Sequence, residues 1–205
     1  METVKQAVIR LFLFILLQFS FIFAKLIIKK PCEKRDMVKD FIYCQRDIPK
    51  DQWRYGLRSS AATGCGWIAC YNALKIMGYK ASPEKLIKYF ERQMPLLNGN
   101  TGTFVLGPAM FFRKFGFKAT TTANRKKFDE TAKQSDVCIV YFWWKEKFKI
   151  GAHFVAFHYT DRGFVGYNTY RRSKGPDNYG YSIDEFLKKR GYFGAVLTGI
   201  TDKRK

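Results

Sequence analysis

Histidine is scarce in this sequence, and several motifs that commonly mark a metal or nucleotide site are missing. The 205 residues include two histidines, and no pair of cysteines is separated by two residues. A structural zinc site of the usual spacing is therefore not expected. The phosphate-binding patterns GxxxxGKS and GxxxxGKT are also absent, and no internal repeat is visible. We expect chemistry that needs neither a metal nor an organic cofactor.

Acidic residues are also few compared with basic ones. Lys and Arg number 37 against 17 Asp and Glu, which gives a net charge of +20. A surface this positive favours anionic partners, and an anionic membrane surface is one of them. The basic residues are dispersed, and no zinc finger or aromatic RNA-binding signature accompanies them, so we expect no specific nucleic-acid site. The chain length suits one well-buried domain, which we expect to be a monomer.

The cysteines do not form a disulfide pattern. There are five of them, an odd number without regular spacing, so at least one thiol is expected to be free. A free thiol close to a base is a candidate nucleophile, whereas a buried one usually acts as a small hydrophobic side chain. We assign the second role to Cys70 and Cys138.

One long hydrophobic run stands out near the N-terminus. The segment Leu11 to Ala24 is almost purely apolar, and residues 1–30 are therefore interpreted as a signal or membrane anchor. A poor small-x-small pattern at its end favours an uncleaved anchor over a secreted product. The basic residues that follow it favour a cytoplasmic downstream side, whereas a secretory signal would predict the opposite. The side of the membrane stays open.

The rest of the chain divides into a linker and one domain. Residues 31–53 are mixed, charged and contain proline, which is typical of a linker into the domain at 54–202. Helical spacing, caps and stop signals come first, and runs rich in Val, Phe and Tyr follow. The order predicts an α+β fold with N-terminal helices packed on a C-terminal antiparallel sheet. The expected helices are 65–77, 82–94, 107–116 and 182–191, and the expected strands are 137–144, 153–159, 163–170 and 194–200.

The sequence "ATGCG" places Cys65 between two glycines where a helix is expected to begin. A cysteine attacks carbonyl groups as the thiolate, and the dipole of a helix N-terminus stabilises that anion. Position alone therefore marks Cys65 as a candidate nucleophile.

A catalytic cysteine also needs a base, and histidine suits that role near neutral pH. His153 and His158 differ by five positions, so in a regular strand their side chains point to opposite faces and at most one meets Cys65. We choose His153 because it begins its strand, where a cleft can reach it. A two-residue hairpin loop after this strand would bring Asn168 to the same face as His153, where it could orient the imidazole, whereas a three-residue loop with a bulge would shift that parity.

The segment "GCGWIACYNALKIMG" resembles the motif of bacterial papain-like cysteine peptidases that process double-glycine leaders. Further matches follow in order in "LGPAMFFRKFGFKA", "GAHFVAFHY" and "GFVGYNTY", and the resemblance covers roughly residues 36–200. It implies a papain-like fold with Cys65 as nucleophile, His153 as general base and acid, and Asn168 as orienting residue.

Two departures from the family pattern bear on activity. Asn168 stands where the leader peptidases usually carry Asp, a change that papain itself shares. Such enzymes also place a Gln about six residues before the nucleophile to complete the oxyanion hole, and Ser59 stands there in this chain. Loss of one oxyanion donor typically costs on the order of a hundredfold to a thousandfold in rate.

These observations predict a thiol-dependent peptidase that cleaves a peptide or amide bond in a peptide or protein substrate through a Cys65 acyl-enzyme. Two alternatives stay open. The same thioester could be captured by an amine or a thiol, which would make the protein an acyl or peptidyl transferase. The second alternative is a catalytically weak domain that binds peptides or anionic surfaces. The missing Gln and the net charge of +20 are the reasons to consider it.

Overall fold

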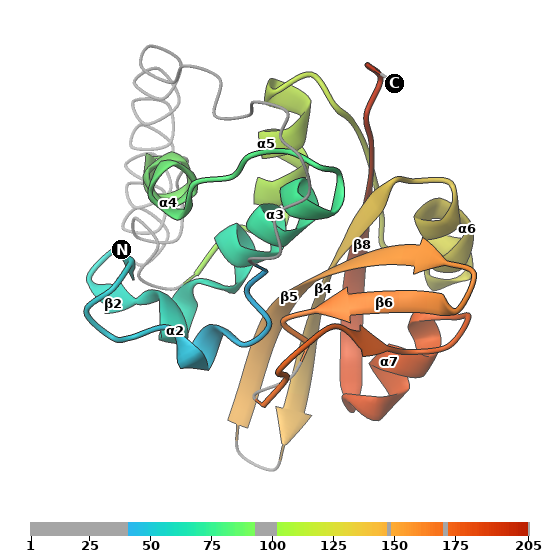
Figure 1. The fold of residues 1–205 in the computed structure, drawn as a ribbon. Coiled ribbons are helices and arrows are strands. Elements are labelled where there is room, and N and C mark those ends of the chain that lie inside the picture. Colours follow the sequence, from blue (N-terminus) through green and yellow to red (C-terminus); the bar gives the residue numbers. More distant parts are fainter. Residues whose placement is uncertain (1–40, 93–101, 147–148, 170–171, 205) are drawn as a thin grey trace, which may run out of the picture.

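The computed structural model of the chain describes residues 41–92, 102–146, 149–169 and 172–204. There the chain forms an α+β domain, in which a six-stranded antiparallel sheet lies between two groups of helices (Figure 1). The expected α+β class is thus confirmed. The signal or anchor segment 1–30 and the first part of the linker lie outside the described residues. No helix within the described ranges is long and apolar enough to cross a membrane.

The first half of the domain is mainly helical. A short 3-10 turn and a two-stranded hairpin lead into the helices, and the turn lies in the segment expected to be a linker. Buried Cys44 and Ile48 on either side of the turn pack into the domain. The elements are η1 (Gln45–Asp47), β1 (Arg54–Tyr55), β2 (Arg58–Ser59), α2 (Ser60–Thr63), α3 (Cys65–Ile76), α4 (Pro83–Arg92) and α5 (Gly107–Lys114).

The second half supplies the large sheet, whose strands run in the spatial order β3-β8-β4-β5-β6-β7. Its first strand, β3, was not among the strands expected from the sequence. The elements are β3 (Lys118–Thr122), η2 (Arg125–Lys127), α6 (Phe128–Lys133), β4 (Val137–Glu146), β5 (Lys149–Thr160), β6 (Gly163–Tyr167), β7 (Asp177–Asn178), α7 (Ile183–Lys189) and β8 (Tyr192–Thr201).

Local signals explain where the helices begin and end. Pro83 opens α4, and the backbone N–H of Lys85 donates to the Ser82 hydroxyl oxygen at 3.2 Å, as the capping pattern predicts. Helix α3 ends just before Gly78, which adopts a φ of 81° that glycine tolerates without strain.

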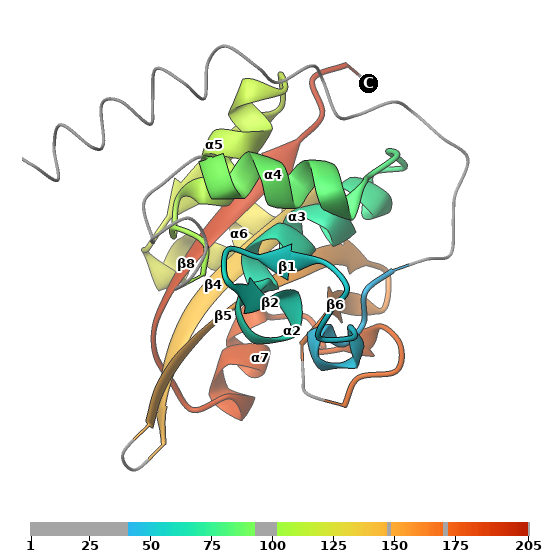
Figure 2. The same cartoon turned by 90° about the vertical axis from the view of Figure 1, so that its left-hand side faces the viewer.

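The two faces of the sheet bury separate hydrophobic cores. Helices α3, α4 and α5 cover one face, and their core includes Phe154 and Ala156 of β5. Helices α6 and α7 cover the other face, whose core includes Val155 and Phe157. Figures 1 and 2 show this arrangement of helices, sheet and helices. Alternation along β5 thus directs neighbouring residues into different cores.

The pairing of β5 with β6 leaves part of β5 with an open edge. Thr160 pairs with Gly163 across a two-residue loop, and the pairing continues only as far as Ala156 with Tyr167. In the described part of the chain, no strand pairs with that side of β5 before Ala156. This open stretch includes His153, and the N-terminal end of α3 lies beside it.

A buried hydrogen-bond network holds the turn before α3. The Ser60 side chain is fully buried, its hydroxyl donates to the Trp53 carbonyl oxygen, and its oxygen accepts from Trp67 Nε1 at 3.1 Å. Trp67 is 0% exposed, so it belongs to the core and does not line a cleft. The network joins the segment before α2 to the first turn of α3.

Replacing Ser60 by Ala should lower the free energy of unfolding by about 1–3 kcal/mol, because the buried indole N–H of Trp67 loses its acceptor. Urea unfolding followed by tryptophan fluorescence measures this change. Ser59→Ala is the matched control, and its effect should stay within about 0.5 kcal/mol. Equal effects of the two substitutions would contradict the role given to Ser60.

Candidate active site

Cys65 is the first residue of α3, and its thiol lies at the open edge of β5. The sulfur is within hydrogen-bonding reach of the backbone of Phe154, of Gly66 and of Cys65 itself. Phe154 directly follows His153 in β5, so the structure brings the expected nucleophile next to the strand position of the expected base.

Burial raises the pKa of the Cys65 thiol, and the hydrogen bonds from Phe154, Gly66 and its own backbone only partly oppose this rise. This direction is opposite to the one expected from a helix N-terminus. The physical reason is that Cys65 packs against the core below α3, where desolvation of the thiolate outweighs the nearby backbone hydrogen bonds. In the free protein the thiol is therefore protonated near neutral pH.

His153 makes one defining hydrogen bond. Its Nε2 lies 2.7 Å from the backbone carbonyl oxygen of Asn168. Because a carbonyl oxygen can only accept, Nε2 carries the proton, and Nδ1 is left as the basic nitrogen of the neutral ring. The ring also packs edge-on against Phe142, with centroids 6.1 Å apart. The tautomer is therefore the one a general base requires.

Burial lowers the pKa of His153 to about 4, and the positive charge of Arg190 contributes to the decrease, while the bond to Asn168 opposes it. Both partners of the candidate pair are thus neutral in the free protein near pH 7. Within the described residues, no hydrogen bond joins the Cys65 thiol to the His153 ring. Catalytic hydrogen bonds are often loose before substrate binds, so this geometry does not exclude general-base catalysis.

The side chain of Asn168 has a different partner from the expected one. Its Oδ1 accepts from the backbone N–H of Gln45 at 2.8 Å, and its Nδ2 donates to Gln45 Oε1 at 3.3 Å. Asn168 has a φ of 60°, a left-handed conformation that asparagine tolerates better than most residues. Its main chain, and not its side chain, therefore contacts the imidazole.

Sequence reasoning missed Gln45. It was assigned to the linker, yet it bonds Asn168 on one side and donates from Nε2 to the Ala61 carbonyl oxygen at 3.1 Å on the other. The turn before the nucleophile is thereby tied to the residue that holds His153. A contact across 123 residues leaves no local pattern in the sequence.

The second histidine lies elsewhere. His158 pairs with Val165 across the β5–β6 hairpin, its ring lies 5.8 Å from that of Tyr167, and burial lowers its pKa. His158 lines neither of the two hollows described below, whereas His153 lines one of them. The choice of His153 over His158 is consistent with this placement.

Two hollows flank the β5 edge. One, of about 550 Å³, is lined by His153 and Asn168, and by three cations, Arg46, Lys189 and Arg190. Within the part of the chain that the structure describes, none of the residues that line it is acidic. We call it the basic hollow.

The other hollow, of about 610 Å³, is lined by Ala152, Tyr141, Trp143 and Thr103 among others, and we call it the aromatic hollow. It adjoins the nucleophile, because a Cβ added at Gly66 would lie 2.2 Å from the Cβ of Thr103. The two hollows thus meet at β5, one beside the imidazole and one beside the first turn of α3.

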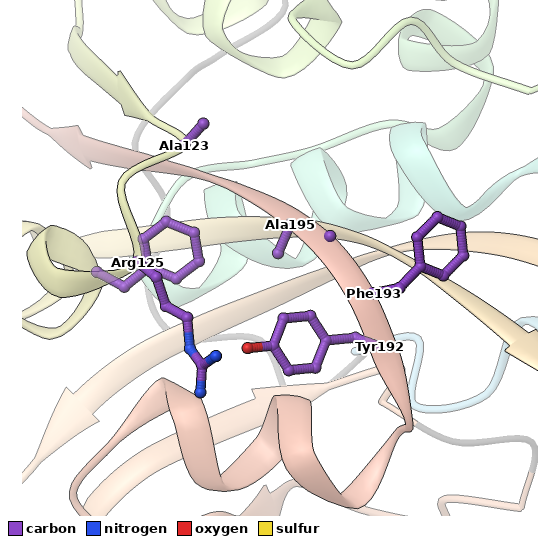
Figure 3. A pocket seen from close by; sticks show the side chains of 7 residues that line it. Ala123, Arg125, Tyr192, Phe193 and Ala195 are labelled. Carbon is purple, nitrogen blue, oxygen red and sulfur yellow. The ribbon is translucent and has the colours of Figure 1, made fainter.

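A third hollow, of about 420 Å³, lies where β8 begins, on the face covered by α6 and α7 (Figure 3). Arg125 stands over the Tyr192 ring, 5.1 Å from its centroid, and pairs with Asp184 of α7. These contacts attach α7 to η2 and β8. Among the described residues that line this hollow there is neither a cysteine nor a histidine, so it offers no thiol or imidazole of the kind found at Cys65 and His153.

Neither a scan against protein-family models nor a search of curated proteins finds a match to this chain. The described residues also contain no cluster of three or more His, Cys, Asp or Glu side chains that could hold a metal ion. No disulfide bond joins any two of the four cysteines within them. Functional interpretation therefore depends on the geometry of Cys65, His153 and Asn168.

Asn168→Gly should keep the Nε2–H tautomer of His153, because glycine retains both the left-handed backbone and the carbonyl acceptor. Asn168→Ala should be less stable than Asn168→Gly by about 1 kcal/mol, because alanine is strained at positive φ. Nitrogen-15 NMR of the histidine rings and urea unfolding measure the two effects, with the ring of His158 as internal control. A shift of the His153 proton to Nδ1 in Asn168→Gly would show that the asparagine side chain sets the tautomer.

Acid should destabilise the protein through His153. Because its pKa of about 4 in the folded state lies below the unfolded value near 6.5, the unfolded chain takes up the proton first as pH falls. Stability should therefore be lost between about pH 6.5 and pH 4, by at most roughly 3 kcal/mol.

The measurement is urea unfolding at several pH values for the wild type, His153→Gln and His158→Gln. The loss should shrink most in His153→Gln, since burial affects the pKa of His153 more strongly than that of His158. An unchanged pH dependence in His153→Gln would refute the assignment.

Proposed function

We propose that this protein is a cysteine peptidase of papain-like type, with Cys65 as nucleophile and His153 as general base and acid. One observation carries the proposal. The Cys65 sulfur lies against the backbone of Phe154, and the neighbouring imidazole of His153 is held by Asn168 in the tautomer that leaves Nδ1 basic. A buried structural cysteine has no need of such an arrangement.

The proposed reaction starts from the neutral pair. His153 Nδ1 accepts the thiol proton as Cys65 Sγ attacks the carbonyl carbon, and the backbone N–H of Cys65 donates to the developing oxyanion. The protonated imidazole then gives its proton to the leaving amine as the C–N bond breaks, which leaves a thioester on Cys65. Water activated by Nδ1 hydrolyses the thioester and restores the thiol.

The two hollows are assigned to the two sides of the scissile bond. Because His153 must protonate the leaving amine, the basic hollow beside it is assigned to the leaving-group side of the scissile bond. The aromatic hollow adjoins Gly66 and is assigned to the acyl side, where Tyr141 and Trp143 offer rings for apolar contact.

The sequence resemblance to double-glycine-leader peptidases supports the reaction type more than the substrate. The oxyanion hole lacks the usual Gln, and neighbouring Ser60 does not replace it, since its hydroxyl is engaged by Trp53 and Trp67. We therefore expect slow turnover. We also keep the N-terminal segment 1–30 as a proposed membrane anchor or secretion signal.

A peptide-binding domain of weak activity is the second candidate. The observation that favours it is the raised pKa of Cys65 together with the lowered pKa of His153, which leaves little thiolate in the free protein. Catalysis then depends on proton transfer during the attack itself.

The decisive experiment incubates the full chain, in mild detergent, with tryptic peptides of a denatured proteome and identifies new peptide ends by mass spectrometry. Cys65→Ala and His153→Gln should lower cleavage by at least about a thousandfold. The matched controls are Cys70→Ala, a buried cysteine of the same helix, and His158→Gln, and both should retain cleavage if they fold.

If Cys65→Ala cleaves as well as the wild type, the proposed nucleophile is wrong. If the wild type cleaves nothing but binds peptides, the binding domain is the better description. Repeating the digestion with added glycine amide separates the proposed hydrolase from a transferase, because a transferase would give amidated products in place of free carboxylates.

A further inference from the structure

The basic hollow gathers positive charge from two parts of the chain. Lys188 and Lys189 both lie in the last turn of α7, where cations interact favourably with the helix dipole, and Lys188 also pairs with Asp184 of the same helix at 3.2 Å. Lys189 and Arg190 line the hollow together with His153, and Arg46 of η1 lines it as well. Three cations from two distant segments thus converge on one concave surface.

Two of these cations are held in position by aromatic residues. Arg190 Nη2 donates to the Tyr179 hydroxyl at 2.9 Å, and its guanidinium lies 5.6 Å from the Phe186 ring centroid. Lys189 Nζ lies 5.6 Å from the Tyr179 ring centroid. Since their side chains are already placed, binding an anion costs little conformational entropy.

The positive charge of Arg190 acts on His153, the proposed general base. Arg190 disfavours the imidazolium form of His153, and the described residues that line the hollow include no Asp or Glu. An anion bound there would offset this repulsion and favour proton transfer from the thiol to the imidazole. Arg190 at the end of α7, Lys189 beside it and Arg46 of η1 line the same hollow as His153, and of these three the charge of Arg190 acts on the imidazole.

We propose that the substrate carries acidic residues immediately on the leaving-group side of the scissile bond, and that Arg46, Lys189 and Arg190 bind them. This inference rests on the proposed peptidase function. The bound segment is an acidic peptide, because the hollow opens beside the group that protonates the leaving amine. The recognition is electrostatic, so it weakens as salt rises.

The test uses the tryptic peptide library with the full chain, since tryptic peptides retain their internal Asp and Glu. Asp and Glu should be enriched at least threefold over their library frequency at the first three positions after the cleaved bond. For a cleaved peptide and its Asn/Gln counterpart, kcat/KM should differ at least tenfold at low salt and converge at high salt. The variant R46E/K189E should lose the preference, and its kcat/KM for a synthetic Lys counterpart of the cleaved peptide should exceed that for the acidic peptide.

The matched control is K118E/K126E, which reverses two exposed lysines outside the basic hollow. Each substitution replaces +1 by −1, so both double variants lower the net charge by the same amount. The control should retain the acidic preference. Loss of the preference in both variants would mean that overall charge, and not the hollow, selects the substrate.

The outcomes separate the two proposals. Cleavage without acidic enrichment overturns the inference and leaves the peptidase intact. Absence of any cleavage overturns the peptidase and the inference with it. If phosphatidylglycerol vesicles inhibit cleavage of acidic and neutral peptides equally, and R46E/K189E relieves this inhibition, the hollow binds a membrane surface and the acidic-peptide assignment is wrong.

Discussion

The point at which β6 stops pairing with β5 determines the rest of the site. Asn168 turns into the left-handed region directly after Tyr167, so β6 ends and β5 keeps an open edge. The same turn directs the Asn168 carbonyl oxygen onto His153. A regular continuation of β6 would cover the edge where Cys65 lies and would use that carbonyl in the sheet. One backbone conformation thus both exposes the strand and fixes the base.

The environment of Cys65 and His153 is dominated by the loss of water. Desolvation raises the pKa of the thiol and lowers that of the imidazole, so each group is held in its uncharged form. The helix N-terminus and three backbone hydrogen bonds do not reverse this balance. Under the proposed function, reactivity at such a site depends on a substrate that changes the local charge, and the cations that line the hollow with His153 are the reason we propose an anionic one.

Much of the fold could be predicted because its signals are local. Ser82 and Pro83 begin a helix, Gly78 ends one, and the alternation of β5 places its residues in two cores. The two-residue hairpin loop between β5 and β6 has the expected length, but Asn168 lies beyond the last paired residue, Tyr167, so strand parity does not place its side chain. Strand β3 was missed because Lys118–Thr122 is short and lacks a run of large apolar residues, although its three Thr favour strands, and its pairing partner β8 lies about 80 residues further along the chain.

The sequence by itself determined the α+β class and singled out Cys65, His153 and Asn168, because caps, glycines and strand periodicity act over a few residues. Tertiary structure alone decided that Asn168 acts through its main chain, that Gln45 joins the site, and that burial, not the helix dipole, governs the pKa of Cys65. These properties arise between segments far apart in the chain. Their energies depend on which groups exclude water from one another, and no local pattern encodes that.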